Sequence, residues 1–109
     1  MRRMAQRPRG TRDFLPDEME RRRHYEDVLR HRASTFGFRE ISTPIFEETE
    51  LFVARSGPNI IEELYAFEDK GGRGISLRPE LTAPAIRLYV NNMSNEPKPV
   101  KAFYFGQCF

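Results

Sequence analysis

Residues 72–84 read Gly-Arg-Gly-Ile-Ser-Leu-Arg-Pro-Glu-Leu-Thr-Ala-Pro, and they predict a strand that stops at a proline and gives way to a helix. Residues 74–78 form the predicted strand, and residues 69–72 (Asp-Lys-Gly-Gly) before it are typical of a hairpin turn. Thr82 is the expected helix N-cap. Polar groups at such a junction are held with little freedom. Glu80 and Thr82 are therefore the best candidates in the chain for binding a small molecule.

Two interpretations fit Glu80 and Thr82. A carboxylate beside a hydroxyl suits an ammonium group, because charge-assisted hydrogen bonds are shorter and stronger than neutral ones. The same two groups also suit helix capping, since the helix dipole stabilises a carboxylate at the N-terminus. Spacing alone favours capping, because caps are common and ligand sites are few. Arg78 precedes Pro79, which holds its backbone extended, and it is expected to bind an anion or to pair with a nearby acid.

A long helix is predicted before this segment, from Asp17 to about residue 36. Asp17 is its expected N-cap, with Glu20 three residues on as the capping-box partner, and Gly37 ends it. Its apolar positions recur at helical spacing and are expected to lie in the core. They are Tyr25, Val28, Leu29, Ala33 and Phe36.

Residues 38–45 predict a strand that Pro44 interrupts. A proline inside a strand usually marks an edge or a bulge. An exposed edge must be covered, because its backbone groups are unpaired. A second copy of the chain and the chain's own loop are about equally good covers on sequence alone.

The remaining pattern completes an α+β arrangement, with helices packed on a mainly antiparallel sheet. Residues 47–55 predict a short helix and residues 64–67 a strand, and the helix after Thr82 buries a stripe at Ile86, Tyr89, Val90 and Met93. Residues 100–109 predict a long strand that is central and buried, with aromatic residues on both faces. Because the chain ends within this strand, we expect it to be an N-terminal fragment of a larger protein.

Composition and charge bound the function. The 109 residues carry a net charge of +2, 31% charged residues and 39% apolar residues, as in a folded domain. Residues 1–39 hold eleven Arg against six acids, which fits either a polyanion partner or a solvated helix face. Cys108 is the single cysteine, expected to be an inert core residue, and no Cys/His spacing indicates a metal site. No apolar run predicts a membrane span or a signal peptide, so a cytoplasmic location is expected.

Four segments, in order, resemble the histidyl-tRNA synthetase family of class II aminoacyl-tRNA synthetases. Residues 10–16 (Gly-Thr-Arg-Asp-Phe-Leu-Pro) resemble its opening segment, and residues 38–47 (Phe-Arg-Glu-Ile-Ser-Thr-Pro-Ile-Phe-Glu) resemble motif 1 with its proline. Residues 64–73 followed by 77–84 resemble the histidine-site segment. Residues 103–109 (Phe-Tyr-Phe-Gly-Gln-Cys-Phe) resemble the strand that enters motif 2.

The resemblance implies a histidine–tRNA ligase that uses ATP with Mg²⁺ to form histidyl-adenylate and then charges the histidine tRNA. It implies that Glu80 and Thr82 hold the α-amino group of histidine and that Leu81 lines the site. It implies a homodimer, with the Pro44 strand in the interface. Residues 1–9 are themselves expected to be a flexible basic lead-in. On the basis of the resemblance, residues 10–109 are the N-terminal portion of a class II catalytic domain, from motif 1 to the start of motif 2.

The resemblance also limits what this piece is expected to do. The motif 2 arginine is expected directly after Phe109, so no catalytic residue is assigned within the chain and at most trace activity is expected. A non-catalytic relative, the regulatory subunit of ATP phosphoribosyltransferase in histidine biosynthesis, is the main alternative. A basic nucleic-acid-binding module and a bare dimerisation domain are the others.

Overall fold

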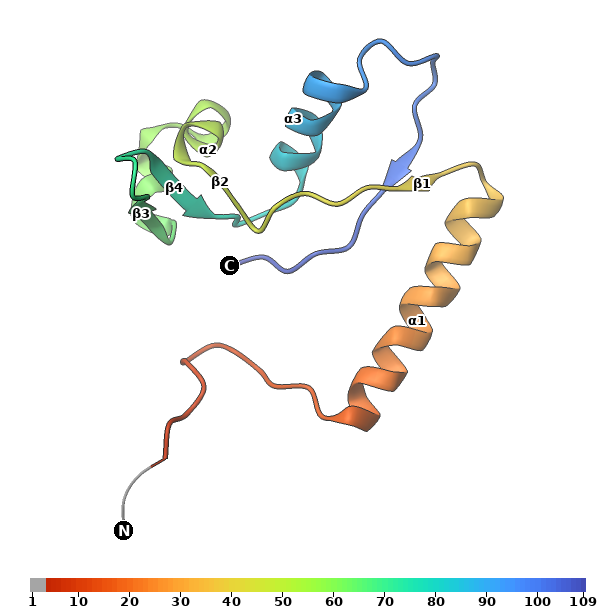
Figure 1. The fold of residues 1–109 in the computed structure, drawn as a ribbon, viewed down its shortest axis with the longest axis horizontal. Helices are drawn as coiled ribbons and strands as arrows, with labels where there is room; N and C mark the ends of the chain where they lie inside the picture. Colours follow the sequence, from red (N-terminus) through yellow and green to blue (C-terminus); the bar gives the residue numbers. More distant parts are fainter. Residues whose placement is uncertain (1–3) are drawn as a thin grey trace. The chain divides into compact units, whose positions relative to one another are not determined.

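The computed structural model describes residues 4–109, which form two compact units. The first unit ends at Gly37, and the second comprises Phe38–Phe109 (Figure 1). The expected flexible lead-in of residues 1–9 falls partly on residues 1–3, which lie outside the described residues.

The first unit contains one helix, α1 (Pro16–Thr35). Leu15, with extended backbone (φ −75°, ψ 165°), is its N-cap, and Pro16 stands in the first turn. The predicted N-cap at Asp17 is therefore wrong. Proline is well suited to the first helical position, where its missing N–H is not needed, and so the helix begins before Asp17. Gly37 ends the helix as predicted, with φ of +83°.

The apolar stripe of α1 is not a core. Tyr25 is 66% exposed and Leu29 56% exposed, and no residue of the helix is buried. The prediction that this stripe is buried is wrong for the part of the chain that the structure describes. Helical spacing shows which residues share a face, but it does not show that the partner surface belongs to the same residues.

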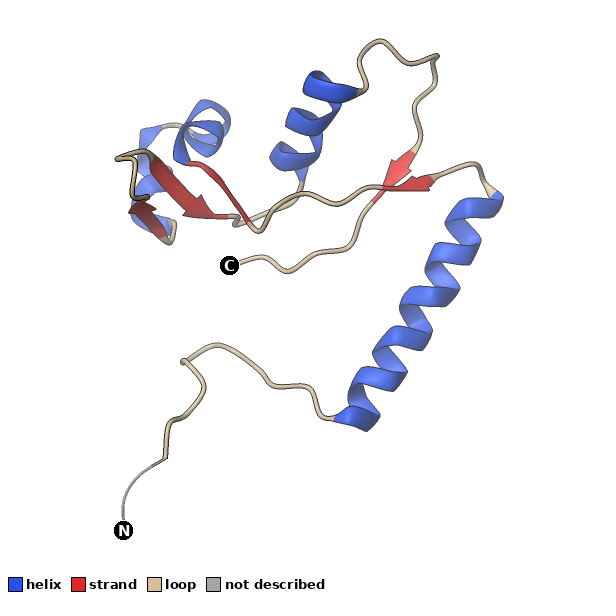
Figure 2. Ribbon diagram, viewed as in Figure 1, coloured by secondary structure: helices blue, strands red, loops and turns tan. Residues whose placement is uncertain are grey.

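The second unit is built on a three-stranded antiparallel sheet of order β2-β4-β3 (Figure 2). Its strands are β2 (Phe46–Glu48), β3 (Ala66–Glu68) and β4 (Gly74–Leu77), with β4 in the centre. The predicted strand at residues 74–78 is confirmed to within one residue. The predicted strand at residues 64–67 is shifted towards Glu68.

The predicted hairpin turn joins β3 to β4. The Asp69 carboxylate accepts hydrogen bonds from the backbone N–H groups of Gly71 and Arg73, at 2.9 and 2.8 Å. Gly72 takes a φ of +80°, which favours glycine. The Arg73 N–H is the main reason that the pKa of Asp69 is lowered from its usual value, with smaller contributions from the Gly71 N–H and the Arg73 charge.

A separate pair of short strands, β1 (Arg39–Glu40) and β5 (Ala102–Phe103), runs parallel. The longer strands predicted over residues 38–45 and 100–109 are therefore wrong in extent, and Pro44 lies between β1 and β2 rather than inside a strand. Within residues 4–109, β5 pairs only with β1. Cys108 is exposed, so its expected core position is also wrong.

Two helices and a turn complete the second unit. They are α2 (Thr49–Ser56), the 3₁₀ turn η1 (Pro58–Glu63) and α3 (Thr82–Asn92). The helix predicted over residues 47–55 corresponds to α2. The observed helix begins two residues later than predicted, because residues 47 and 48 belong to β2.

The core of the second unit is small. It centres on Phe52, 2% exposed, together with Ala83 and Pro84. The predicted stripe of α3 is wrong, since Ile86 and Val90 are more than half exposed. The overall class is nevertheless the predicted one, an α+β fold with a mainly antiparallel sheet and flanking helices.

Candidate functional site

The junction between β4 and α3 carries the predicted binding residues. Glu80 and Leu81 are half-buried, and Thr82 is exposed as the first residue of α3. Leu81 is the N-cap and makes no side-chain capping hydrogen bond. Thr82 is thus one position further into the helix than predicted. The three residues are consecutive and lie where the chain passes from β4 to α3.

Of the two side chains expected to suit helix capping, Glu80 and Thr82, it is Glu80 that caps the helix. Its carboxylate accepts the backbone N–H of Thr82 at 2.5 Å and the backbone N–H of Ala83 at 3.2 Å. These N–H groups have no partner inside the helix, because the first turn of a helix leaves its donors unpaired. The positive end of the helix dipole also favours the negative carboxylate.

Capping leaves some hydrogen-bond acceptor positions of the Glu80 carboxylate unused. An ionised carboxylate offers about four acceptor positions on its two oxygens. The described hydrogen bonds bring only two backbone N–H groups to it. The cap therefore fixes the orientation of a carboxylate that can still accept a further donor. Capping and ammonium binding, which sequence treated as alternatives, are compatible in this geometry.

Arg78, two residues before Glu80, is the most constrained charged group of the junction. It is 5% exposed. Its Nε donates to the carbonyl of Gln107 at 2.7 Å, and its Nη1 donates to the carbonyls of Thr43 and Pro44, each at 3.1 Å. Among the described residues its hydrogen-bond partners are thus backbone carbonyls and the Thr43 hydroxyl. The expectation that Arg78 binds an anion or an acid is not met by these contacts.

The main chain of Arg78 extends the same connection. Its N–H donates to the carbonyl of Ile45, and its carbonyl accepts the N–H of Phe109, both at 2.9 Å. One residue therefore joins the segment around Pro44, the end of β4 and the segment after β5. Sequence reasoning missed this role, because the partners lie 29 and 35 residues away.

Gly106 makes room for the Arg78 side chain. A Cβ at position 106 would lie 2.5 Å from Nη2 of Arg78 and 3.0 Å from Cδ2 of Leu81. Real Cβ atoms do not approach other atoms so closely, so a side chain here displaces the guanidinium group. Gly106 is thus required by packing rather than by backbone conformation.

Two further buried polar contacts support the second unit. Glu47, 7% exposed, receives two hydrogen bonds from Arg87 of α3, at 2.5 and 3.0 Å. Ser76 of β4 is fully buried, and its hydroxyl lies 2.7 Å from that of Thr49. Glu47 and Arg87 are 40 residues apart, and no local pattern signals their pairing. Both contacts hold β2 and β4 against the helices.

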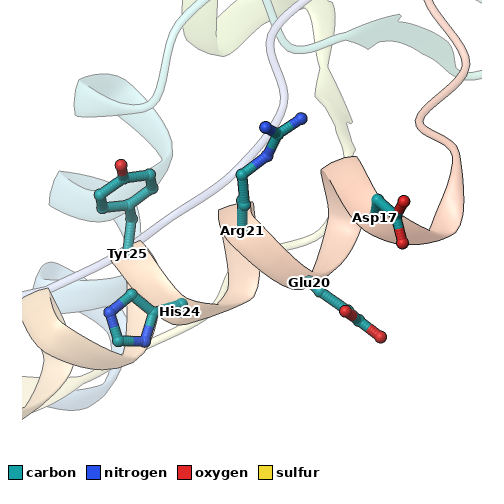
Figure 3. Close-up of a pocket in the computed structure, with 5 residues that line it drawn as sticks. All are labelled: Asp17, Glu20, Arg21, His24 and Tyr25. Atoms are coloured by element: carbon teal, nitrogen blue, oxygen red, sulfur yellow. The ribbon is translucent and has the colours of Figure 1, made fainter.

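Two surface recesses can be compared with this junction. One recess of about 360 Å³ is lined entirely by α1. Figure 3 shows that its side chains fan outward from the helix without converging on one point; they are Asp17, Glu20, Arg21, His24 and Tyr25. An apolar groove of about 430 Å³ runs between α2 and α3, with Leu51, Ile86 and Val90 among its lining residues. Neither recess includes Glu80 or Thr82.

The described residues contain no group of three or more His, Cys, Asp and Glu side chains able to hold a metal ion. His24 and His31, seven residues apart on α1, are exposed. A bilayer-spanning helix is likewise absent from the described part of the chain.

Comparison with known proteins decides the family. The family model described as "Histidyl-tRNA synthetase" matches residues 10–109. The chain belongs to this family. The match begins at the segment Gly-Thr-Arg-Asp-Phe-Leu-Pro that carries the resemblance and continues through the β4–α3 junction.

Relatives in the histidyl-tRNA synthetase family are similar over nearly the whole chain. The histidine–tRNA ligase of Methanospirillum hungatei is 63% identical over 106 residues, which are 97% of this chain and 26% of that protein. Apo histidyl-tRNA synthetase of S. aureus superposes with a TM-score of 0.84 at 41% identity, over 97% of this chain and 29% of that one. The chain therefore spans about a quarter of the length of the relatives that it matches.

One solved structure in the same comparison carries both names that the sequence suggested. It is an ATP phosphoribosyltransferase regulatory subunit/histidyl-tRNA synthetase from Bacillus halodurans C. It matches with a TM-score of 0.83 at 26% identity, over all of this chain and 28% of that one. The histidine–tRNA ligase of Methanospirillum hungatei is far more similar in sequence, at 63% identity.

Proposed function

We propose that this chain is the histidine-binding portion of a histidine–tRNA ligase, which activates histidine with ATP and transfers it to the histidine tRNA. The observation that carries the proposal is the Glu80 carboxylate, half-buried and oriented by the Thr82 and Ala83 N–H groups at the start of α3. Membership of the histidyl-tRNA synthetase family supports it, as does 63% identity to a histidine–tRNA ligase.

In this proposal Glu80 and Thr82 hold the α-ammonium group of histidine. The ammonium has three donors, and it approaches the free acceptor positions of the Glu80 carboxylate and the exposed Thr82 hydroxyl. Charge-assisted hydrogen bonds of this kind are about twice as strong as neutral ones. Leu81, half-buried between the two, lines the site. Fixing the ammonium in this way orients the carboxylate of histidine for reaction with ATP.

The adenylation chemistry itself is assigned to residues other than these. The histidine carboxylate attacks the α-phosphorus of ATP, which gives histidyl-adenylate and releases pyrophosphate, and the acyl group then passes to the terminal ribose of the tRNA. Residues 4–109 offer no cluster of ligands that fits Mg²⁺. We therefore derive no step through the metal and assign this chain to binding and orienting histidine.

We propose further that the parent protein is a class II enzyme, a homodimer and cytoplasmic, with the segment at Pro44 at the subunit interface. Pro44 is exposed, and so is the apolar stripe of α1 that includes Tyr25 and Leu29. A dimer would bury apolar surface that the described residues leave open. The cytoplasmic location follows from the proposed substrates, tRNA and ATP.

The test is amino-acid-dependent exchange of pyrophosphate into ATP, followed by tRNA charging, with the full-length protein that contains this chain. We expect exchange with histidine and not with the other amino acids, and charging of the histidine tRNA. Residues 1–109 alone are expected to show at most trace exchange. Turnover of this piece close to that of the full-length protein would contradict that expectation.

Three other outcomes would replace the proposal. Stimulation of an ATP phosphoribosyltransferase without exchange would identify the regulatory relative. Salt-dependent RNA binding without binding of histidine or ATP would identify a nucleic-acid-binding module. Dimerisation without any of these activities would identify a dimerisation domain.

A further inference from the structure

We infer that Arg78 is a positioning residue for amino-acid binding, which acts by holding the loop that carries Glu80. The inference rests on the proposed role of Glu80 and extends it to a residue that does not face the ligand. Its basis is the set of contacts that Arg78 makes, together with the close approach of Gly106.

The burial of the Arg78 side chain is unusually costly. Arg78 is 5% exposed, and a guanidinium group is charged at all physiological pH values. Burial of a charge is strongly unfavourable unless hydrogen bonds replace its hydration. Here the replacement consists of the carbonyls of Thr43, Pro44 and Gln107, with no acid among the described partners. A buried cation whose hydrogen bonds go only to the main chain and a hydroxyl indicates a role in fixing the positions of these segments.

The position of Arg78 also restricts the position of Glu80. Pro79 restricts Arg78 to extended backbone and has a fixed φ of its own, so little rotation is left between Arg78 and Glu80. Glu80 is in turn fixed at its other end by the N–H groups at the start of α3. The loop is therefore held by Arg78 on one side and by the helix on the other. A shift of the guanidinium group moves the Glu80 carboxylate with it.

These contacts require an arginine at position 78, and another cationic side chain cannot make them. Nε points to Gln107 while Nη1 points to Thr43 and Pro44. The planar, forked guanidinium group presents donors in these separate directions. A lysine ammonium is a single point on a flexible stem and cannot occupy both positions at once. Arg78→Lys thus keeps the charge and breaks the connection.

The experiment measures the KM for histidine and kcat in pyrophosphate exchange, with the full-length protein and its Arg78→Lys, Arg78→Met and Gly106→Ala variants. Gly106→Ala keeps the arginine but displaces its guanidinium group, and its methyl group also approaches Leu81. We expect all three to raise the KM for histidine by about tenfold to a hundredfold, in keeping with the effect of small misplacements in a binding site. The KM for ATP is expected to change less.

The matched control is Ser76→Ala, which removes a buried hydrogen bond from the same strand. A variant that only lowers stability reduces the amount of active protein, so it lowers the apparent kcat and leaves the KM for histidine unchanged. Ser76→Ala is expected to behave in this way. If Arg78→Met does not fold, Arg78→Lys and Gly106→Ala still decide the question.

Glu80→Gln separates this inference from the proposed function. If Glu80→Gln raises the KM for histidine while the Arg78 and Gly106 variants behave like Ser76→Ala, the positioning role is overturned and the proposed function stands. If Glu80→Gln leaves the KM unchanged, the proposed role of Glu80 fails, and the positioning role fails with it.

Discussion

The side chains of the β4–α3 junction and those of helix α1 (Pro16–Thr35) differ in how far they are buried and hydrogen-bonded. At the junction, the buried Arg78 and the half-buried Glu80 find their hydrogen-bond partners within the second unit. On α1, Tyr25 and Leu29 are 66% and 56% exposed, and no residue is buried. The junction thus fixes its polar side chains within the second unit, whereas α1 buries none of its apolar side chains.

The contacts of the junction are local to this part of the fold, whereas those that would bury the α1 stripe are not. Polar side chains at the junction are fixed by backbone groups of neighbouring segments, and those segments are all present in residues 38–109. The stripe on α1 has the spacing of a core helix, and burial of such a face requires a second apolar surface. We therefore expect substitutions at the junction to affect folding and ligand binding, and substitutions on the α1 stripe to affect assembly.

The largest expected effect on stability is at the small core beside the junction. Phe52→Ala should lower the free energy of unfolding of the full-length protein by about 3–5 kcal/mol, the usual range for a buried phenylalanine. Phe52 is 2% exposed. Phe67→Ala is the control, since Phe67 is 50% exposed and should cost only about 1 kcal/mol. Urea unfolding checks both values, and equal losses would show that Phe52 is not the centre of the core.

A smaller effect on folding, but a large one on assembly, is expected on α1. Leu29→Glu places a charge in the exposed apolar stripe, so it should shift the proposed dimer towards monomer and change the unfolding free energy of the monomer by no more than about 0.5 kcal/mol. Sedimentation velocity over a range of concentrations measures the shift. Ser34→Glu, which adds the same charge on the other side of the helix, is the control. Dimers of equal strength in both variants would contradict an interface at this stripe.

Features of these two regions that depend on residues adjacent in sequence could be predicted, and features that depend on distant residues could not. The hairpin at residues 69–72 and the strand that stops before Pro79 depend on adjacent residues, and both were predicted. The helix N-cap was misplaced by two positions, at Asp17 rather than Leu15, because a capping pattern at Asp17 competed with a proline suited to the first turn. A capping role for Glu80 was among the predictions and is confirmed, but the predicted N-cap at Thr82 is one residue too late.

The remaining features could not be predicted, because they depend on residues distant in sequence. Arg78 meets Thr43 and Gln107, and Glu47 meets Arg87, only after the chain has folded. Helical spacing predicted burial for Leu29 and for Ile86, yet spacing carries no information on which surface covers a face. Family resemblance supplied the identity of the ligand, which neither spacing nor the hairpin chemistry specifies.

The smallest expected effect concerns the hairpin, and it depends on pH. The pKa of Asp69 is lowered in the folded chain, chiefly by the Arg73 N–H. A lowered pKa means that the ionised carboxylate stabilises the fold above the unfolded pKa. This contribution is lost as the pH falls through the lower, folded pKa. Unfolding curves between neutral pH and about pH 3 should show a loss of stability in acid that is smaller in Asp69→Asn, because the usual aspartate pKa is about 3.9. An identical loss in both proteins would show that Asp69 does not contribute.

The most direct test of the account is the affinity for histidine of Glu80→Gln, measured by calorimetric titration with the full-length protein. Glutamine keeps the size of the side chain and one acceptor oxygen for the cap, but it removes the charge that the ammonium group needs. Glu62→Gln, at an exposed glutamate of η1, is the control. We expect Glu80→Gln to weaken histidine binding by about tenfold to a hundredfold, the value of a hydrogen bond to a charged group. ATP binding should be nearly unchanged. Histidine affinity equal to that of the unmodified protein would contradict the assignment of the β4–α3 junction as the histidine site.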